Sequence, residues 1–339
     1  SGNVVVVAGR ANLAESAEAT VAALQTVLDG CPGATVLPAL RRGNVVGALS
    51  VGLAPADADH DGLATLRAAA EGRLELLVLL GADPLNDCPD ADLARRAIAG
   101  ARRVLAIDTF PSESTQHADV VLAASAYGEK AGTTTNLEGR VTTLAQQVTA
   151  TGTSRPDWMI AVELGLMIGA HSFGADHPLR GVSTVDDVTA LVAATVPGFA
   201  AVTLDALRDE PNGVLSAPHQ AALGEVSFSA PGRNSYDYRL VVSRKLYDRA
   251  VGTQMSRSLI NLAPGSAVHV HPLDLDSLGV SDGDDVKIVS AKAASVLPIA
   301  ANNRVPRGVV WSPFNQGGGT IEDIVDGGAA TTDVRIERL

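Results

Sequence analysis

The feature that most constrains the fold is a change in the spacing of apolar residues along the chain. Through residues 1–150, short apolar runs alternate with segments whose apolar residues recur at helical spacing. From Tyr238 onward the pattern becomes an alternation with a period of two, interrupted by turn residues. The sequence therefore predicts an α/β region followed by a separate region built almost entirely of strands.

The N-terminal region contains strands that are separated by helices. Strands are expected at 4–8, 76–80, 104–107 and 120–123, and amphipathic helices at 13–28 and 90–99. Short, continuously apolar strands that alternate with helices are typical of a parallel sheet covered on both faces. We therefore expect a Rossmann-like α/β domain over residues 1–150.

A helical connection and a linker are expected over residues 151–235. One helix is predicted to begin at Pro156, because proline suits the first helical position. A second is predicted over 183–196, with Ser183 or Thr184 as its N-cap. Residues 211–235 are rich in Gly, Pro, Ser and Asn, which is typical of a linker.

The C-terminal region, residues 236–339, is predicted to form a small closed β-barrel. Strands are expected at 239–243, 267–271, 286–290, 296–300 and 309–312, with one short helix at 272–278. Many short strands with turn residues between them and a single small helix favour a barrel.

Charge and hydropathy restrict the possible partners. The formal net charge is -12, so the chain repels phosphate backbones and anionic lipid surfaces. No apolar run reaches the roughly 20 residues that a membrane-spanning helix needs. We expect no nucleic-acid partner, and any membrane association would have to pass through another subunit.

The two cysteines, Cys31 and Cys88, limit the redox chemistry. Two thiols cannot hold a Cys₄ iron–sulfur cluster, and a sequence so poor in cysteine fits a reducing compartment. Asp83, Asp87 and Asp90 surround Cys88, and we expect their charges to raise its pKa and blunt its reactivity. The N-terminus has neither a signal pattern nor an initiator Met, and we expect it to continue a longer chain.

Residues 57–62, Asp-Ala-Asp-His-Asp-Gly, resemble the start of an EF-hand calcium loop. That loop needs a glutamate at its twelfth position, where this chain has Ala68; Glu71 follows three residues later. We favour a solvated loop that caps the helix expected at 63–70.

His269 and His271 lie two residues apart on a predicted strand and could share a metal. Apart from Asp274 on the following helix, no nearby side chain completes a ligand set, so a structural role is favoured. Phosphate-binding glycine motifs are also absent. Residues 8–12 do not form G-x-G-x-x-G, and the run 317–319 lacks the lysine and helix of a phosphate loop. No G-x-S-x-G motif occurs either.

The most distinctive block is residues 128–140, Gly-Glu-Lys-Ala-Gly-Thr-Thr-Thr-Asn-Leu-Glu-Gly-Arg. Its Gly, Thr and Asn content is typical of tight turns, so we expect an ordered loop at the carboxyl ends of sheet strands. Glu129, Lys130, Glu138 and Arg140 could form an ion-paired clasp within it.

This block resembles the molybdopterin oxidoreductase superfamily. The resemblance also includes residues 80–84, 117–122 and 156–158, and in the last region 270–274 and 278–286. The last region is similar to the family's pterin-dinucleotide-binding barrel, which is of the double-psi type. Together these segments cover most of the chain.

Three details resemble one kind of family member, the large iron–sulfur subunit of NADH–quinone oxidoreductases (the G subunit, 75 kDa-type). The block ends Asn136-Leu-Glu-Gly-Arg, where many molybdenum enzymes have Glu-Arg-Arg. The pattern Asn44-x-x-Gly47-Ala48-x-x-x-Gly52 is similar to that subunit. Residues 246–258 keep a Gly-Thr and a Ser-Arg, but depart from the pattern that grips the pterin.

The resemblance implies a scaffold. Iron–sulfur clusters would lie upstream of residue 1, and this segment would hold no catalytic, cofactor-binding or metal-binding residues and no molybdopterin. Its partners would be other subunits of the peripheral arm, on the cytoplasmic side of the cell membrane.

Two alternatives remain open. One is the C-terminal half of a molybdenum or tungsten bis-pterin enzyme similar to formate dehydrogenase. The other is a non-catalytic module that keeps a nucleotide in a relic pterin site.

Overall fold

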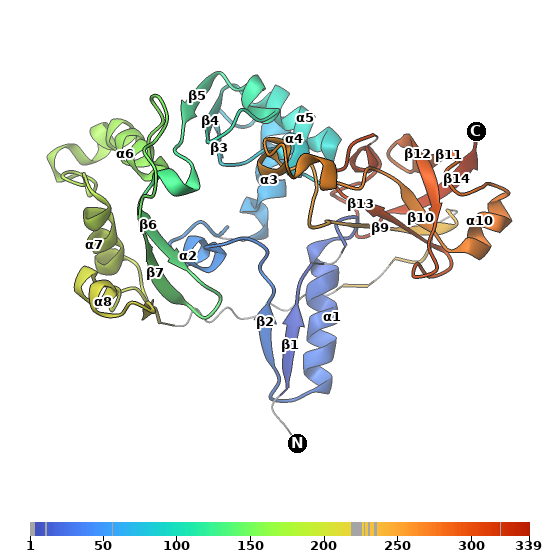
Figure 1. Ribbon diagram of the computed structural model, residues 1–339, viewed down its shortest axis with the longest axis horizontal. Coiled ribbons are helices and arrows are strands. Elements are labelled where there is room, and N and C mark those ends of the chain that lie inside the picture. The colour runs from blue at the N-terminus through green and yellow to red at the C-terminus, as the bar shows by residue number, and fades with distance from the viewer. Residues whose placement is uncertain are drawn as a thin grey trace.

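The computed structural model describes residues 4–10, 12–55, 57–217, 226, 228–229, 231–233, 236–318 and 320–339. Figure 1 shows a central α/β body, a helical lobe beside it and a β-barrel on the opposite side. Strands β1 and β2 and helix α1 project from the body toward the N-terminus. The α/β body and the C-terminal barrel confirm the predicted fold class. The predicted domain boundaries after residues 150 and 235 stay a prediction.

The N-terminal strands form two separate parallel sheets. β1 (Val5–Ala8) pairs with β2 (Thr35–Pro38), and α1 (Ala17–Gly30) connects them. β3 (Leu77–Leu80), β4 (Val104–Asp108) and β5 (Val120–Ala123) form the second sheet, in that order. The prediction of one continuous sheet was therefore wrong, and β2 was missed because its four residues end in a proline. Such a short run carries little periodic signal.

One face of the second sheet is covered by α3 (Gly62–Ala70) and α5 (Ala91–Gly100). Leu77 and Leu79 point into this core together with Ala97 and Ala106, so small residues let the helices approach the strands closely. α4 (Pro84–Asp87) follows β3 and leads into α5.

The other face of this sheet is covered only in part. Ile160 of α6 (Asp157–Phe173) packs on Ile107 and Ala124 near the carboxyl ends of β4 and β5. Val78 and Leu80 of β3 remain about half exposed, at 48% and 49%. The expectation of a sheet covered on both faces was wrong at β3, because α6 packs on β4 and β5 and not on β3.

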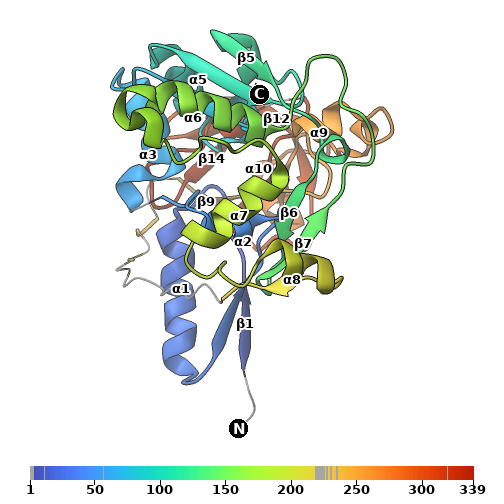
Figure 2. The ribbon, with the colours of Figure 1, turned by 90° about the vertical axis from the view of Figure 1, so that its left-hand side faces the viewer.

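The helical lobe is built on a small antiparallel sheet of β6 (Gly132–Thr135), β7 (Arg140–Leu144) and β8 (Val214–Leu215). α7 (Val185–Thr195) and α8 (Leu204–Asp209) complete it, and Figure 2 views the molecule from this side. The block expected to be a loop is therefore largely a hairpin. Its three consecutive threonines favour a strand, as β-branched residues do.

The linker expected over 211–235 was partly wrong, since β8 pairs there with β7. The greater part of the stretch from 218 to 235 lies outside the described residues.

The C-terminal barrel closes in the order β10-β12-β11-β14-β9-β13. Its strands and helices are β9 (Tyr238–Ser243), α9 (Val251–Gln254), β10 (Val268–Val270), α10 (Pro272–Leu278), β11 (Asp285–Ser290), β12 (Ala294–Ala301), β13 (Val309–Pro313) and β14 (Asp333–Arg338). The predicted alternation is confirmed, because Tyr238, Leu240 and Val242 of β9 all point into the core. The terminal strand β14 was missed, because four of its six residues are charged.

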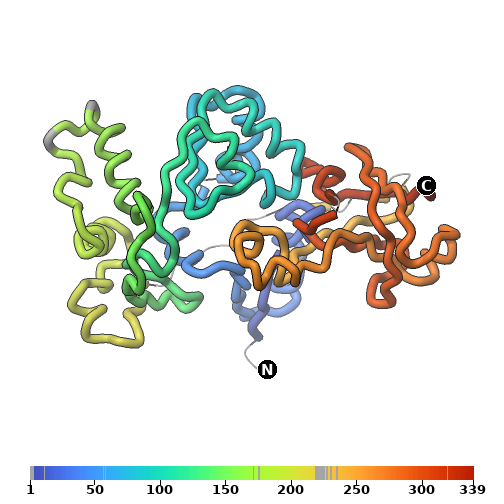
Figure 3. The backbone as a smooth tube through the Cα atoms, turned by 45° about the horizontal axis from the view of Figure 1, so that its top comes forward, coloured from blue at the N-terminus to red at the C-terminus, as the bar shows by residue number. Residues whose placement is uncertain are grey.

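The barrel is fastened to the body by polar contacts. Lys292 pairs with Asp90 at the start of α5, and Arg244 Nη2 lies 3.0 Å from Asp87 Oδ1. The amide of Leu13 donates to Val242 O of β9 over 2.7 Å. Figure 3 shows the barrel lying beside the α/β body. Within the described residues no helix is both long and apolar enough to cross a bilayer.

Candidate functional site

A cavity of about 740 Å³ lies between the body and the helical lobe. Four elements line it: α2 (Val45–Ser50), the β6–β7 hairpin, the first turns of α6, and α7. Leu80 at the end of β3 contributes one wall, and Tyr127 lies at the rim and is 78% exposed. The volume falls in the range of about 300–1,000 Å³ that small-molecule sites occupy.

Most of the wall is apolar. The apolar lining residues come from every surrounding element: Ala48, Val51, Leu53, Leu80, Ala131, Val141, Leu144, Ala161, Val185, Val188, Val192, Phe199 and Val202. Val141 and Phe199 also belong to the lobe's own core, which fixes their positions. These two side chains are therefore shared between the cavity wall and the lobe's core.

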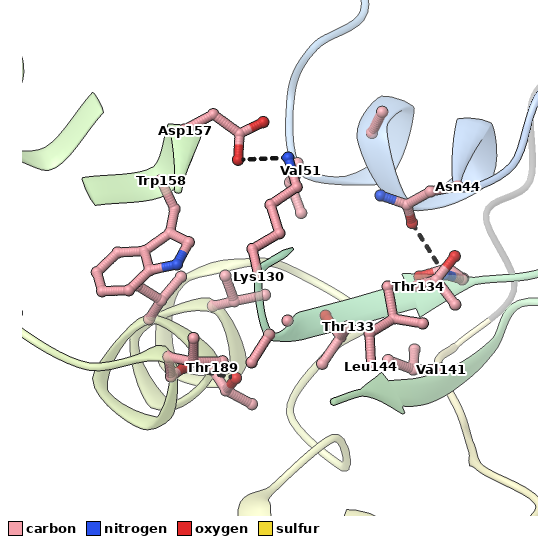
Figure 4. Close-up of a pocket in the computed structure, with 18 of the residues that line it drawn as sticks. Asn44, Val51, Lys130, Thr133, Thr134, Val141, Leu144, Asp157, Trp158 and Thr189 are labelled. Carbon is pink, nitrogen blue, oxygen red and sulfur yellow. Dashed lines mark hydrogen bonds and ion pairs between the residues drawn. The ribbon is translucent and has the colours of Figure 1, made fainter. Parts of the chain in front are cut away.

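An ion pair and an indole lie together at one end of the cavity, as Figure 4 shows. Lys130 Nζ donates to Asp157 Oδ1 over 2.9 Å, so the cation is neutralised by a neighbour. Trp158 lies beside this pair with its indole nitrogen turned toward Lys130. Trp158 Nε1 is buried and has no hydrogen-bond partner among the described residues. An orphaned buried donor costs free energy until an acceptor reaches it.

The opposite end is fixed by a contact between α2 and β6. Asn44 precedes α2 in the left-handed conformation, with φ 60°, and its Oδ1 accepts from the amide of Thr135 over 2.9 Å. A Cβ on Gly47 would lie 2.3 Å from Asn44 Oδ1 and 2.8 Å from Thr135 Oγ1. The pattern Asn44-x-x-Gly47 is thus explained by a close approach of helix to strand.

The predicted four-residue clasp does not form. Glu129 Oε2 accepts from the amide of Ala126, and Lys130 pairs with Asp157 on another element. Only Glu138 and Arg140 approach each other, with 3.8 Å between Glu138 Oε2 and Arg140 Nε. Arg140 Nη1 also donates to Gly213 O beside β8 over 2.9 Å. The block is therefore held mainly by contacts to other segments.

The loop at 57–62 acts as a helix cap, which confirms the favoured interpretation. Asp61 Oδ1 accepts from the amide of Ala64 at the start of α3, and Asp57 Oδ1 accepts from the amide of Asp59. Asp57 also contacts His60 Nδ1 over 2.6 Å, so the first carboxylate is already engaged.

The two barrel histidines have separate structural contacts. The ring of His269 lies 4.6 Å from that of Trp311, and burial together with the charge of Lys245 lowers its pKa. His271 Nδ1 accepts from the amide of Leu273 and so caps α10. Asp274 accepts from Arg307 and from the amide of Gly308. Each candidate ligand is thus engaged elsewhere.

Cys88 is buried, and burial is the main cause of its raised pKa; the charge of Asp90 adds to it. The expected direction is confirmed, although burial outweighs the neighbouring charges. Of the glycine run, Gly317 and Gly318 follow β13, whereas Gly319 lies outside the described residues.

The sequence did not indicate that Lys130, Asp157 and Trp158 meet at one end of a cavity. Residues 156–158 were noted as a helix start and as part of the family resemblance, and the partner of Lys130 was sought within its own block. A tryptophan in the first turn of a helix that follows a threonine-rich strand was the available signal. The expectation that the segment holds no site residues stays a prediction.

Two protein-family models match this chain. Residues 4–166 match the family described as "Molybdopterin oxidoreductase". Residues 238–334, the barrel, match the "Molydopterin dinucleotide binding domain".

Relatives carry several different names. NADPH-Fe(3+) oxidoreductase subunit alpha of Geobacter sulfurreducens is 27% identical over 84% of this chain and 32% of its own length. The NADH-quinone oxidoreductase G 2 subunit of Rhizobium meliloti is 28% identical over 77% of this chain and 30% of its own. F420-dependent formate dehydrogenase 1 subunit alpha of Methanococcus maripaludis is 23% identical over 84% and 48%. The chain thus spans about a third to a half of these curated relatives.

Acetylene hydratase from Pelobacter acetylenicus is similar in structure, with a TM-score of 0.62 at 14% sequence identity. The match covers 81% of this chain and 46% of that one. At this identity the likeness concerns the fold alone.

Proposed function

We propose that the chain is a member of the molybdopterin oxidoreductase family, whose models match residues 4–166 and 238–334, and that it is a scaffold region of an NADH–quinone oxidoreductase. It would form the C-terminal part of the iron–sulfur subunit and support electron transfer from NADH to quinone. The clusters would lie in the preceding part of the full polypeptide. Neighbouring peripheral-arm subunits, on the cytoplasmic side of the membrane, would be its partners.

The observation that carries this proposal is the exposure of apolar side chains on regular elements. Val5 and Val7 of β1 are 57% and 66% exposed, and Met167 and Ile168 of α6 are 71% and 74% exposed. Val5 and Val7 share one face of β1, and Met167 and Ile168 are neighbours on α6, so each element exposes a pair of apolar side chains that another protein surface could bury. The remaining polypeptide and the adjacent subunits are its proposed cover.

The cavity does not fit a phosphate-bearing pterin dinucleotide. Such a ligand needs several cations or free amides around its phosphates. Lys130 is already neutralised by Asp157, and the surrounding wall is made of valine, leucine and threonine. At the barrel, Arg244 is shared between Asp87 and Asp248 and lies over the ring of Phe314. Both of these cations are thus committed to the protein's own carboxylates.

A metal-ligand set is also not assembled by these residues. Among the residues that the structure describes, no group of three His, Cys, Asp or Glu side chains is placed to hold an ion. A metal centre at this part of the chain would therefore need ligands from outside the described residues.

A second candidate is the C-terminal half of a pterin-dependent dehydrogenase. It is favoured by the relatives named formate dehydrogenase and by the barrel's match to a dinucleotide-binding domain. In that case the missing cations and metal ligand would have to come from the rest of the polypeptide.

Native purification of the tagged full-length protein from detergent-solubilised membranes separates these candidates. The scaffold role predicts co-purification with a flavin subunit, a quinone-site subunit and integral membrane subunits, identified by mass spectrometry. Recovery alone, or with one small soluble partner, would favour the dehydrogenase. Substituting Met167 and Ile168 by serine should weaken the association if α6 contributes to the interface, whereas Asp205→Asn on exposed α8 is the matched surface control.

A further inference from the structure

We propose that the free edge of β3 and the apolar strip beside it bind a strand-and-helix unit from the part of the full polypeptide that precedes residue 1. The inference takes from the proposed function only the premise that this region continues a longer polypeptide. It holds for the scaffold and for the dehydrogenase alike, because it concerns how this region joins the rest of the chain.

β3 lies at an edge, although its sequence is that of a central strand. Leu77–Leu80 is continuously apolar, and strands of a parallel sheet have such sequences when both of their faces are buried. β3 is nevertheless the first strand of the β3-β4-β5 sheet, and no described strand pairs with its outer side. Natural proteins protect exposed edges with charges or prolines, and β3 has neither.

The backbone of β3 is ready to pair on this side. The amides of Leu77 and Gly81 each donate over 2.9 Å to a carbonyl oxygen at or directly before β4. Successive backbone groups of a strand point to opposite sides, so the amides and carbonyls of Val78 and Leu80 point to the free edge. A further parallel strand can therefore pair there without any change in β3.

The side chains of β3 form an apolar strip on the face that α6 leaves open. Leu76, Val78 and Leu80 are 47%, 48% and 49% exposed, whereas Leu77 and Leu79 between them point into the core. α6 packs on β4 and β5. A helix is about 10–12 Å wide and strands lie about 4.8 Å apart, so α6 spans about two strands. One further helix beside α6, joined to a strand beside β3, would cover the strip.

The occupant is assigned to the same polypeptide on two grounds. The chain spans 32%, 30% and 48% of the three relatives described above, so each of them has more than half of its length outside the match. A strand that extends a parallel sheet is reached through a crossover connection, which a single chain supplies.

Hydrogen exchange of the purified full-length protein, without other subunits, tests the proposal and needs no variant. Electron-transfer fragmentation of a peptide that spans residues 74–82 resolves single amides. The amides of Val78 and Leu80 should exchange at least about a hundredfold more slowly than unstructured amides. Those of Leu77 and Gly81, which are bonded within the sheet, are the matched controls and show that it is folded.

Free exchange at Val78 and Leu80 would overturn the proposal. Protection that appears only after assembly with other subunits would assign the edge to a separate protein and would overturn it as well. Failure of the full-length protein to co-purify with respiratory subunits would leave the expected protection unchanged, so this proposal and the scaffold role fail separately.

Photo-leucine, which replaces leucine with little change in shape, identifies the occupant. Crosslinks from Leu76 and Leu80 should reach peptides that precede residue 1, as mass spectrometry of the digested protein would show. Crosslinks from these two positions to residues 1–339 alone would overturn the proposal. A crosslink between light and heavy chains in a mixed-isotope preparation would assign the edge to a second copy and would also overturn it.

Discussion

Replacing Gly47 by alanine should destabilise the lobe around the cavity, although alanine is the better helix former. The new Cβ would lie 2.3 Å from Asn44 Oδ1, 2.8 Å from Thr135 Oγ1 and 3.1 Å from Thr135 Cβ. None of these atoms is at the far end of a long side chain, so the helix and the strand must separate. Overpacking of this kind costs about 1–3 kcal/mol.

Two further contributions to the free energy of unfolding nearly cancel. Separation breaks the hydrogen bond from the Thr135 amide to Asn44, at a cost of about 1 kcal/mol. Replacing glycine by alanine inside α2 restores about 1 kcal/mol of helix propensity. The net loss in the free energy of unfolding is therefore about 1–3 kcal/mol.

The matched control is Gly43→Ala, four residues earlier and also on the cavity wall. A Cβ there would meet no atom within 4 Å, so the same substitution should change stability by less than about 0.5 kcal/mol. Urea unfolding followed by tryptophan fluorescence measures both, because Trp158 lines the same cavity. Equal stability of the two variants would refute the close-approach explanation of the Asn44-x-x-Gly47 pattern.

Three other outcomes are expected. Burial raises the pKa of Glu322, so its contribution to stability is full at low pH and lost as pH rises through that pKa; Glu322→Gln should flatten this dependence in urea titrations at several pH values. Burial opposes ionisation of Asp90, but the hydrogen bond from its lysine partner lowers its pKa, so its contribution is present at neutral pH and lost on acidification. Asp90→Asn should lower the free energy of unfolding by about 1–3 kcal/mol at pH 7 in the same titration, whereas Asp92→Asn in an exposed ion pair should lower it by less than about 0.5 kcal/mol. Equal effects of the two substitutions would contradict a stabilising role of the buried Asp90–Lys292 pair. Iodoacetamide should alkylate Cys31 well before buried Cys88, as peptide mass mapping would show, and the reverse order would contradict the raised thiol pKa.

Strands and helices could be predicted best from the sequence where one face of the element is fully buried. In the barrel, Leu240 and Val242 of β9 and Val286 and Ile288 of β11 alternate with more exposed neighbours, and that periodicity is visible without any structure. Helix α10 was predicted with its bounds because Pro272 and Gly279 mark its two ends. Signals of this kind depend only on residues that are close in sequence, so they can be recognised without the structure.

Other features depend on contacts between distant segments. The block at 128–140 was expected to be a loop, but it contains β6 and the start of β7. The pairing of β7 with β8 joins residues more than seventy positions apart, so no local pattern indicates it. The cavity's polar end unites Lys130 and Trp158 from different elements, and no local pattern states that they meet. The exposure of one face of β3 likewise depends on the position of α6, which packs on β4 and β5.

Elemental analysis of the purified, fully assembled protein tests the scaffold role most directly. Molybdenum, tungsten and iron would be quantified against subunit concentration in one preparation, with iron reporting that the clusters are intact. The scaffold role predicts several irons per chain and no stoichiometric molybdenum or tungsten. About one molybdenum or tungsten atom per chain would contradict it and establish a pterin-dependent enzyme.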